Sequence, residues 1–211
     1  MAPEGYHHGN LRPALVQAAR ELLADGRDSD PSLREVARRA GVSHAAPYRH
    51  FGNFAALREE VAAAVMRDLA AAIRSAGRRA GDHPEMALRA AATAYLRYQL
   101  SHPGEAKQFI ERNHADIPAD SPALAAGEDA LVALGEILYR GQQSGVFVDT
   151  DIELLVKTCW ALVHGVHMFV TIGKYERVSP AKASQLVDPH LDLLLSGIRV
   201  TGAPPAAATS K

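Results

Sequence analysis

The segment that most restricts how this chain can fold is residues 33–51, with the sequence LREVARRAGVSHAAPYRHF. Its pattern predicts two short helices, one over 34–40 and one beginning at Ser43, joined by a tight Gly-Val turn. Ser43 is a favourable N-cap, and Pro47 falls in the first turn of the second helix, where a missing backbone N–H costs little. This is the layout of a helix-turn-helix, whose second helix enters the major groove of DNA.

Helical spacing divides this segment into an inner and an outer face. Ala37 and Gly41 lie four residues apart, where small residues let two crossing helices approach closely. The residues predicted to face inward are Leu33, Val36, Ala40, Val42, Pro47 and Phe51. The residues left on the outer face are His44, Ala45, Tyr48 and Arg49.

The charge of the chain is informative only when it is counted locally. The net charge is −1 overall. Residues 32–58, however, contain five arginines and a single acid, Glu35. A positive face on a neutral body suits a protein that binds one DNA site and leaves it, because phosphate neutralisation supplies most of the affinity. A merely solvated surface would explain the arginines but not the Gly, Ser, Tyr and Phe spacing.

The residues around the motif make the match more specific. YHHGNLRPALVQAARELL precedes it and HFGNFAALREEVAAAV follows it, so that residues 6 to about 65 resemble the N-terminal domain of TetR-family transcriptional regulators. The family pattern is a Ser or Thr cap, three variable residues, an apolar residue and Tyr-x-(His/Tyr)-Phe, which Ser43 to Phe51 match. One position departs, since Phe54 stands where the family usually has a phosphate-binding Lys; Arg58, one turn on, is a candidate replacement.

The resemblance implies which residues contact DNA. Tyr48, Arg49, His44 and Ala45 are expected to face bases or phosphates, and Ser43 and His50 to hold backbone phosphates. Arg34 is expected to approach the DNA backbone from the first helix of the motif, and Arg12, with residues 6–10, to reach a flanking groove. The partner is therefore a double-stranded operator, and the two-fold symmetry of a homodimer would make it an inverted repeat.

Length and composition indicate an all-α, two-domain protein. The 211 residues suit one small and one larger domain, and an alanine-rich chain with 6% aromatic residues favours helix throughout. Cys159 is the single cysteine, which fits a reducing compartment. No signal peptide is apparent, and no apolar run reaches the ~18 residues of a membrane span. We expect a cytoplasmic protein with no membrane partner.

The pattern divides the chain into a helix-turn-helix domain over 1–58, a ligand-binding and dimerisation domain over 59–200, and a disordered tail over 201–211. Further helices are predicted with short breaks between them. They are 53–76 capped by Asn53, 84–101, 104–113, about 121–145 capped by Asp120 or Ser121, 151–172 capped by Asp149 or Thr150, and a final segment from Pro180 that Pro189 divides or kinks, with Asp188 as a second cap.

The segment TCWALVHGVHMF, within 151–172, resembles the Trp-x-x-x-His-Gly signature of one type of TetR-family C-terminal domain. A helix this apolar on all sides must be enclosed by its own domain and by a second subunit. In the family the last two helices form the dimer interface, which implies the interface residues Leu162, Phe169, Leu191, Leu194, Leu195 and Ile198. Large side chains with polar handles mark a ligand cavity, which gives the ligand-binding candidates Tyr95, Tyr98, Phe109, Trp160, His164 and Met168.

Three alternatives remain beside these assignments. His164 and His167 lie three residues apart and together could hold a metal or haem iron. An equal alternative is that Trp160 and His164 only pack a subunit interface, with the imidazole bonded to a backbone carbonyl. The sequence around Ser43 approximates the G-x-S-x-G nucleophile elbow of a hydrolase, but that elbow requires a preceding strand.

The sequence thus predicts a transcriptional regulator, a repressor that a small-molecule effector releases from its operator. No enzymatic activity, cofactor or bound metal is expected. The effector would enter among the helices of 59–175 and favour an arrangement whose two DNA-reading heads no longer match the operator spacing.

Overall fold

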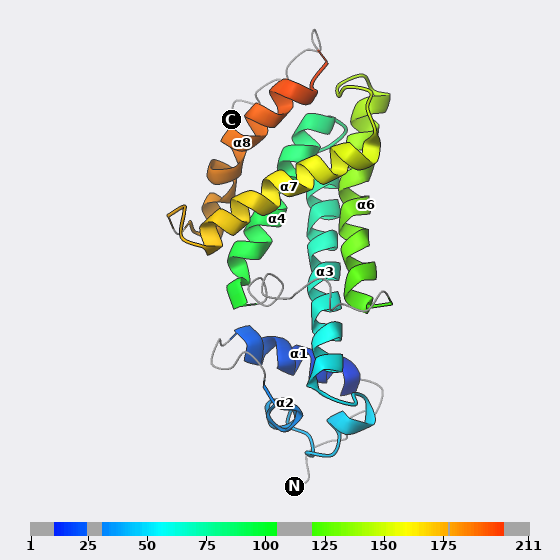
Figure 1. Cartoon of the computed structure of the whole chain (residues 1–211), viewed down its shortest axis with the longest axis vertical. Coiled ribbons are helices and arrows are strands. Elements are labelled where there is room, and N and C mark those ends of the chain that lie inside the picture. Colours follow the sequence, from blue (N-terminus) through cyan, green and yellow to red (C-terminus); the bar gives the residue numbers. More distant parts are fainter. Residues whose placement is uncertain (1–10, 25–30, 105–119, 177, 201–211) are drawn as a thin grey trace. The chain divides into compact units, whose positions relative to one another are not determined.

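The computed structural model describes residues 11–24, 31–104, 120–176 and 178–200 (Figure 1). Within these ranges the chain forms seven α-helices and two 3-10 helices, and its one β-bridge joins Phe147 to Arg199. The all-α fold is therefore confirmed. The predicted helix over 104–113 lies almost wholly outside the described residues, as does the whole of the tail. The chain divides into two compact units, Met1–Val65 with His102–Ala125, and Met66–Ser101 with Ala126–Lys211.

The first unit is built from α1 (Leu11–Ala24), α2 (Leu33–Arg39), η1 (Pro47–Arg49) and the first part of α3 (Phe54–Arg79). Its fully buried side chains include Leu15, Val36 and Leu57. Helix α2 begins with a capping box that the sequence analysis missed. The Ser32 amide donates to Glu35 Oε2 at 2.7 Å, and the Glu35 amide donates back to Ser32 Oγ at 3.3 Å. The bond from the Ser32 amide, together with one from the Ser32 hydroxyl to the same carboxylate oxygen at 2.8 Å, lowers the pKa of Glu35.

The turn of the motif is confirmed, but its second helix differs from the prediction. Gly41 adopts φ +69°, and a Cβ placed there would meet nothing within 4 Å, so this glycine serves the turn and not a close helix crossing. Residues 43–51 form successive turns around η1, with Ala46 donating to the Ser43 carbonyl at 3.0 Å and His50 donating to the Pro47 carbonyl at 2.9 Å. Pro47 has no N–H to give to the Ser43 carbonyl, so the α-helical bond that would start at Ser43 cannot form.

The second unit combines the rest of α3 with α4 (Pro84–Ser101), most of α6 (Pro122–Gln143), α7 (Ile152–Thr171), η3 (Pro180–Lys182) and α8 (Ala183–Ile198). Helix α4 packs against both α7 and α8, which lie beside it in Figure 1. The predicted cap of α3 is confirmed, since Asn53 Oδ1 accepts from the Ala56 amide at 2.9 Å. So is Ser121 at the start of α6. The cap of α7 is Asp151, one residue beyond the predicted pair.

Helix α8 runs without interruption through Pro189, so the predicted division there is wrong. Pro189 and Gln185 are both exposed. The carbonyl that loses its intrahelical partner therefore faces water, which can satisfy it. Asp188 is not a cap; its carboxylate lies 3.9 Å from the Arg89 guanidinium of α4.

Glycine 141 allows the end of α6 to pack closely on a core aromatic. Phe147 is 1% exposed, and a Cβ on Gly141 would overlap its ring. The following backbone is tied to the end of α8, with Val148 donating to the Ile198 carbonyl at 2.8 Å and Val200 donating to the Val146 carbonyl at 3.1 Å.

Candidate nucleic-acid interface and effector cavity

The helix-turn-helix segment presents its predicted outer residues to solvent. Pro47 and Phe51 are buried and anchor the turn in the first unit. Between them Tyr48 is 55% exposed and Arg49 is exposed. Of the five further predicted residues beside them, four are exposed, namely Arg34, Ser43, His44 and Ala45, whereas His50 is half-buried. One segment thus gathers a guanidinium, a phenol and two imidazoles on the outer face.

Arg12, which the sequence predicts to reach a flanking DNA groove, pairs with residues of its own unit in this structure. Its guanidinium lies 2.5 Å from Glu60 Oε1 and 4.7 Å from the centre of the Phe51 ring, and it donates to the His50 carbonyl at 3.4 Å. A carboxylate on a neighbouring helix and an aromatic face are both good partners for Arg. In this structure Arg12 therefore links α1 to residues 43–51, the reading segment, while its side chain stays 47% exposed.

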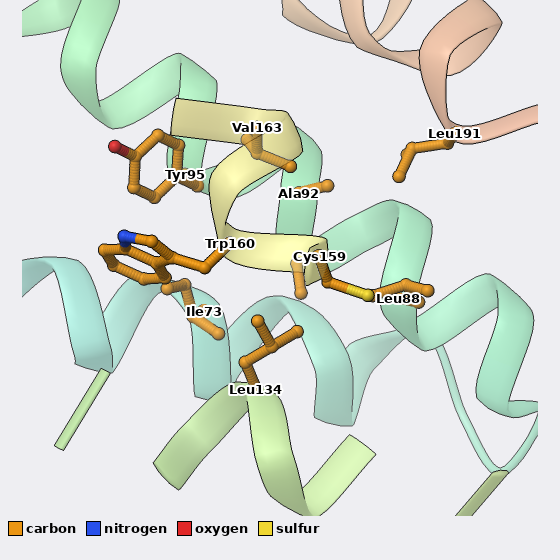
Figure 2. Close-up of a pocket in the computed structure, with 10 residues that line it drawn as sticks. Ile73, Leu88, Ala92, Tyr95, Leu134, Cys159, Trp160, Val163 and Leu191 are labelled. Carbon is orange, nitrogen blue, oxygen red and sulfur yellow. The ribbon is translucent and has the colours of Figure 1, made fainter. Parts of the chain in front are cut away.

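A small apolar cavity lies in the second unit. Side chains from α3, α4, α6, α7 and α8 converge on it (Figure 2). Its lining consists of Ile73, Leu88, Ala91, Ala92, Tyr95, Leu134, Cys159, Trp160, Val163 and Leu191. The free volume is about 20 Å³, close to the space of one water. Burial raises the pKa of the Cys159 thiol to about 12, so this thiol is neutral and serves as an apolar wall.

A polar cluster adjoins the cavity behind the Tyr95 ring. The Tyr95 hydroxyl lies 2.8 Å from His164 Nδ1, and Gln99 Nε2 donates to the same hydroxyl at 3.3 Å. Tyr95 is 3% exposed, and this burial raises its phenol pKa above the ordinary value. Its ring meets Trp160 edge-on at 5.1 Å between centres.

His167 completes the cluster on the next turn of α7. It is 3% exposed, and its ring centre lies 6.5 Å from that of Tyr95 and 6.3 Å from that of His164. His167 Nε2 lies 3.3 Å from Thr171 Oγ1, whereas Nδ1 has no hydrogen-bond partner among the described residues. Burial, together with the nearby His164, lowers the pKa of His167 to about 4. The imidazole is therefore neutral at pH 7.

Two family models match the parts of the chain that contain the reading segment and the cavity. Residues 15–61 match "Bacterial regulatory proteins, tetR family", and residues 88–194 match "Tetracyclin repressor-like, C-terminal domain". The chain belongs to the TetR family. No curated protein sequence matches this TetR-family chain. As a member it is a ligand-responsive, DNA-binding transcriptional regulator.

Solved structures agree with this membership. A Rhodococcus sp. RHA1 protein of unknown function is 28% identical with a TM-score of 0.80, over 93% of this chain and 100% of its own. SmeT of Stenotrophomonas maltophilia, a repressor of a multidrug efflux pump, is 18% identical with a TM-score of 0.66, over 95% and 96%. Bacillus subtilis FadR, solved with stearoyl-CoA, is 17% identical with a TM-score of 0.72, over 89% and 99%.

The structure places only part of the predicted pocket set around the cavity of this TetR-family chain. Tyr95 and Trp160 line it, and His164 reaches it only through the Tyr95 hydroxyl. Tyr98 and Met168 are half-buried and are not among the lining residues, and Phe109 lies outside the described residues. Most of the cavity wall is aliphatic. The sequence prediction selected large side chains that carry a polar group, so it missed these aliphatic residues. Gln99 was also missed, although its spacing of four from Tyr95 on α4 was a usable signal.

The predicted interface set needs a similar correction. Leu191 and Leu195 are 0% exposed and Ile198 is 9% exposed within the single chain. They form the stripe of α8 that packs inside the second unit, and Leu191 lines the cavity. These three side chains therefore cannot supply an intersubunit surface. Leu162 and Leu194 are half-buried and Phe169 is 49% exposed, so these three remain accessible.

The sequence expectation of no membrane-length apolar segment also needs qualification. Helix α7 has 20 residues and a mean hydropathy of 1.3, enough by length and composition to cross a membrane. One third of that stretch is buried in the structure. Core helices of water-soluble proteins pass the same test, and the buried side of α7 packs on α4 and α8.

Proposed function

We propose that this TetR-family regulator is a homodimeric repressor that binds an inverted-repeat operator and leaves it when a small molecule enters the cavity between α4 and α7. The observation that carries the DNA-binding part is the segment of residues 43–51. Two buried anchors, Pro47 and Phe51, hold Tyr48 and Arg49 outward. SmeT, which shares the fold, is itself a repressor.

In this proposal the reading segment supplies both base and phosphate contacts. Tyr48, Arg49, His44 and Ala45 face the bases or the nearest phosphates, and Ser43, His50 and Arg34 hold the backbone. Arg12 acts from behind, as a positioning residue that keeps α1 and the reading segment together through Glu60 and Phe51.

The second subunit covers the apolar surface of α7 and α8. The exposed apolar residues there are Leu154 at 61%, Phe169 at 49%, Ile172 at 57% and Leu193 at 76%. A soluble monomer rarely exposes such a set on two neighbouring helices. A two-fold interface would cover it and would place two reading heads on one operator. We infer a cytoplasmic protein with no membrane partner.

The signal between effector and operator is proposed to travel along α3. Ile73 of α3 lines the cavity, and Leu57 of the same helix lies in the core of the first unit. We retain residues 1–58 as the DNA-binding domain and 59–200 as the effector and dimerisation domain. Under this proposal the preference of the effector for one arrangement of α3 sets how strongly the regulator responds.

Neither alternative function is favoured. Ser43 follows helix α2 and not a strand, so the backbone of a nucleophile elbow is missing there. Among the described residues no group of three His, Cys, Asp or Glu side chains is placed to hold a metal ion. We therefore propose no enzymatic activity, no cofactor and no metal. The bond from Tyr95 favours an effector-side role for His164 over a purely interfacial one.

The test is DNA binding by the purified full chain. An operator is selected from random duplexes, and its affinity is measured by fluorescence anisotropy over a series of salt concentrations. We expect a two-fold symmetric site and an affinity that falls steeply with salt, by a log–log slope of ~0.9 per phosphate contact. Failure to select any sequence, or a salt-independent affinity, would overturn the proposal.

A further inference from the structure

The hydrogen bonds beside the cavity restrict where the protons of Tyr95, His164 and His167 can lie. Gln99 Nε2 can only donate, so the Tyr95 oxygen accepts from it, and the same hydroxyl lies 2.8 Å from His164 Nδ1. Thr171 Oγ1 donates its single proton to the His167 carbonyl at 3.1 Å. The same oxygen lies 3.3 Å from His167 Nε2. With the hydroxyl proton on the carbonyl, this contact is a hydrogen bond when Nε2 carries a proton and donates it.

In this tautomer, His167 Nδ1 is an unprotonated nitrogen that can only accept a hydrogen bond. The side chain is 3% exposed, and no described residue bonds to Nδ1. A buried acceptor without a partner costs free energy, and such groups are rare in native structures unless a ligand or water completes them. The missing partner has to be a hydrogen-bond donor.

The surroundings define the rest of that partner. His167 is not itself part of the cavity wall, but its ring centre lies 6.5 Å from that of Tyr95, which is. The wall is aliphatic and aromatic, and no charged side chain lines it among the described residues. An anion would meet a lone pair and no cation, and a cation would have no counter-charge. A neutral molecule with an apolar body and one hydroxyl satisfies both the wall and the nitrogen.

We propose that the effector is a neutral hydroxylated molecule, of the phenol or alcohol class, whose apolar body expands the cavity beside Trp160 and whose hydroxyl donates to His167 Nδ1. This inference rests on the proposed function, because it takes the cavity to be the effector site. An effector of this class differs from the anionic acyl thioester stearoyl-CoA, with which Bacillus subtilis FadR was solved.

The chain carries its own reporter for the test. Trp160 is the only tryptophan and lines the cavity, so its emission reports on this site alone. The full-length protein without DNA is titrated with 4-propylphenol, with its methyl ether 4-propylanisole, and with the anion 4-propylbenzoate. The three share an apolar body and differ in what they offer to Nδ1.

We expect 4-propylphenol to bind on the order of tenfold more tightly than 4-propylanisole, the value of one net hydrogen bond. His167→Leu removes the acceptor and should abolish that ratio. His167→Asn keeps an acceptor near the Nδ1 position and should retain most of it. His190→Leu is the matched control, because His190 is a half-buried histidine of α8 whose two nitrogens are already bonded to Tyr175 and the Leu186 carbonyl. It should leave the ratio unchanged.

Equal affinities for the phenol and the ether in the wild type would overturn the inference, as would tightest binding of the benzoate or no binding of any probe. A phenol preference that survives in His167→Leu would do the same. None of these measurements contains DNA. Operator binding that persists when the phenol preference is absent would leave the proposed regulator intact, whereas loss of operator binding would count against the regulator alone.

Discussion

At the residue scale, the reading segment divides its work between buried and exposed side chains. Pro47 and Phe51 are buried, and Tyr48 and Arg49 between them are exposed. The buried pair maintains the turn, whereas the exposed pair contributes little to the core. Affinity for DNA and stability of the fold are therefore separable by substitution at neighbouring positions.

Replacement of Arg49 by Ala should weaken operator binding without changing the melting temperature. Loss of a bidentate base contact costs ~1–3 kcal/mol, and loss of a phosphate contact would lower the salt slope by about one. Anisotropy titrations with the selected operator measure both. Arg97→Ala, at an exposed position of α4 in the second unit, is the control and should bind like the wild type. Unchanged affinity in Arg49→Ala would remove Arg49 from the interface.

His167 should make the protein less stable in acid. Its pKa falls from the usual 6.5 to about 4 in the folded chain. Between these pH values the unfolded state binds the proton and the folded state does not, so the stability that is present above pH 6.5 is lost as pH falls. The loss should approach about 3 kcal/mol near pH 4. Urea unfolding at fixed protein concentration from pH 7 to pH 4.5 measures it.

His167→Leu should remove most of this pH dependence, whereas His190→Leu should retain it. A pH profile in His167→Leu that is as steep as the wild-type profile would mean that other groups control the acid sensitivity.

At the element scale, two of the three glycines of α6, Gly127 and Gly141, have opposite requirements. A Cβ on Gly141 would overlap the buried Phe147 ring, and a Cβ on Gly127 would meet nothing within 4 Å. Gly141 is required for close packing against Phe147. Gly127 makes no such contact and only lowers the stability of the helix.

Gly141→Ala should destabilise the protein by ~1–3 kcal/mol through overpacking. Gly127→Ala should stabilise it by up to ~1 kcal/mol through helix propensity. Thermal unfolding of the two variants beside the wild type gives the comparison within one helix. A stable Gly141→Ala variant would show that the Phe147 ring can shift without cost.

The elements also show how far a sequence can be interpreted. Apolar periodicity and cap residues predicted α3, α4, α6 and α7 because those signals are local. The prediction of a second α-helix in the motif was wrong. Pro47 has no N–H to donate to the Ser43 carbonyl, and this loss prevents an α-helix from starting at Ser43. The stripe of α8 was assigned to a subunit interface because periodicity reveals an apolar face but not whether the same chain covers it.

The cavity was predicted least well. Tyr95 and Trp160 were identified by their size and polarity, but most of the wall is aliphatic and comes from five helices far apart in sequence. His167 carries the unpaired nitrogen, and a spacing of three residues from His164 had suggested only a metal ligand. Tertiary packing decides which side chains meet, and a single sequence contains no direct record of it.

At the scale of the whole molecule, the exposed apolar residues of α7 and α8 are unusual for a chain that works alone. They lie on two helices whose other sides already form the core of the second unit. Burial by a symmetric partner would remove them from water.

Phe169→Arg should shift the protein from dimer to monomer and abolish operator binding, because a charge in an apolar interface has no partner. Sedimentation equilibrium should give twice 22.6 kDa for the wild type and 22.6 kDa for the variant. Met86→Arg changes a 41% exposed side chain on α4 and should stay dimeric. A wild-type protein that sediments as a monomer at micromolar concentration would contradict the interface.

A cavity of about 20 Å³ has a consequence for the speed of the response. If this cavity is the effector site, as proposed, an effector larger than a water would need the helices around Trp160 to separate, and its entry would wait for a fluctuation of the protein. Stopped-flow traces of Trp160 emission should then give a rate that rises with effector concentration and levels off at the opening rate. The regulator would then respond to effector that is present for longer than the opening time, and it would not respond to shorter pulses.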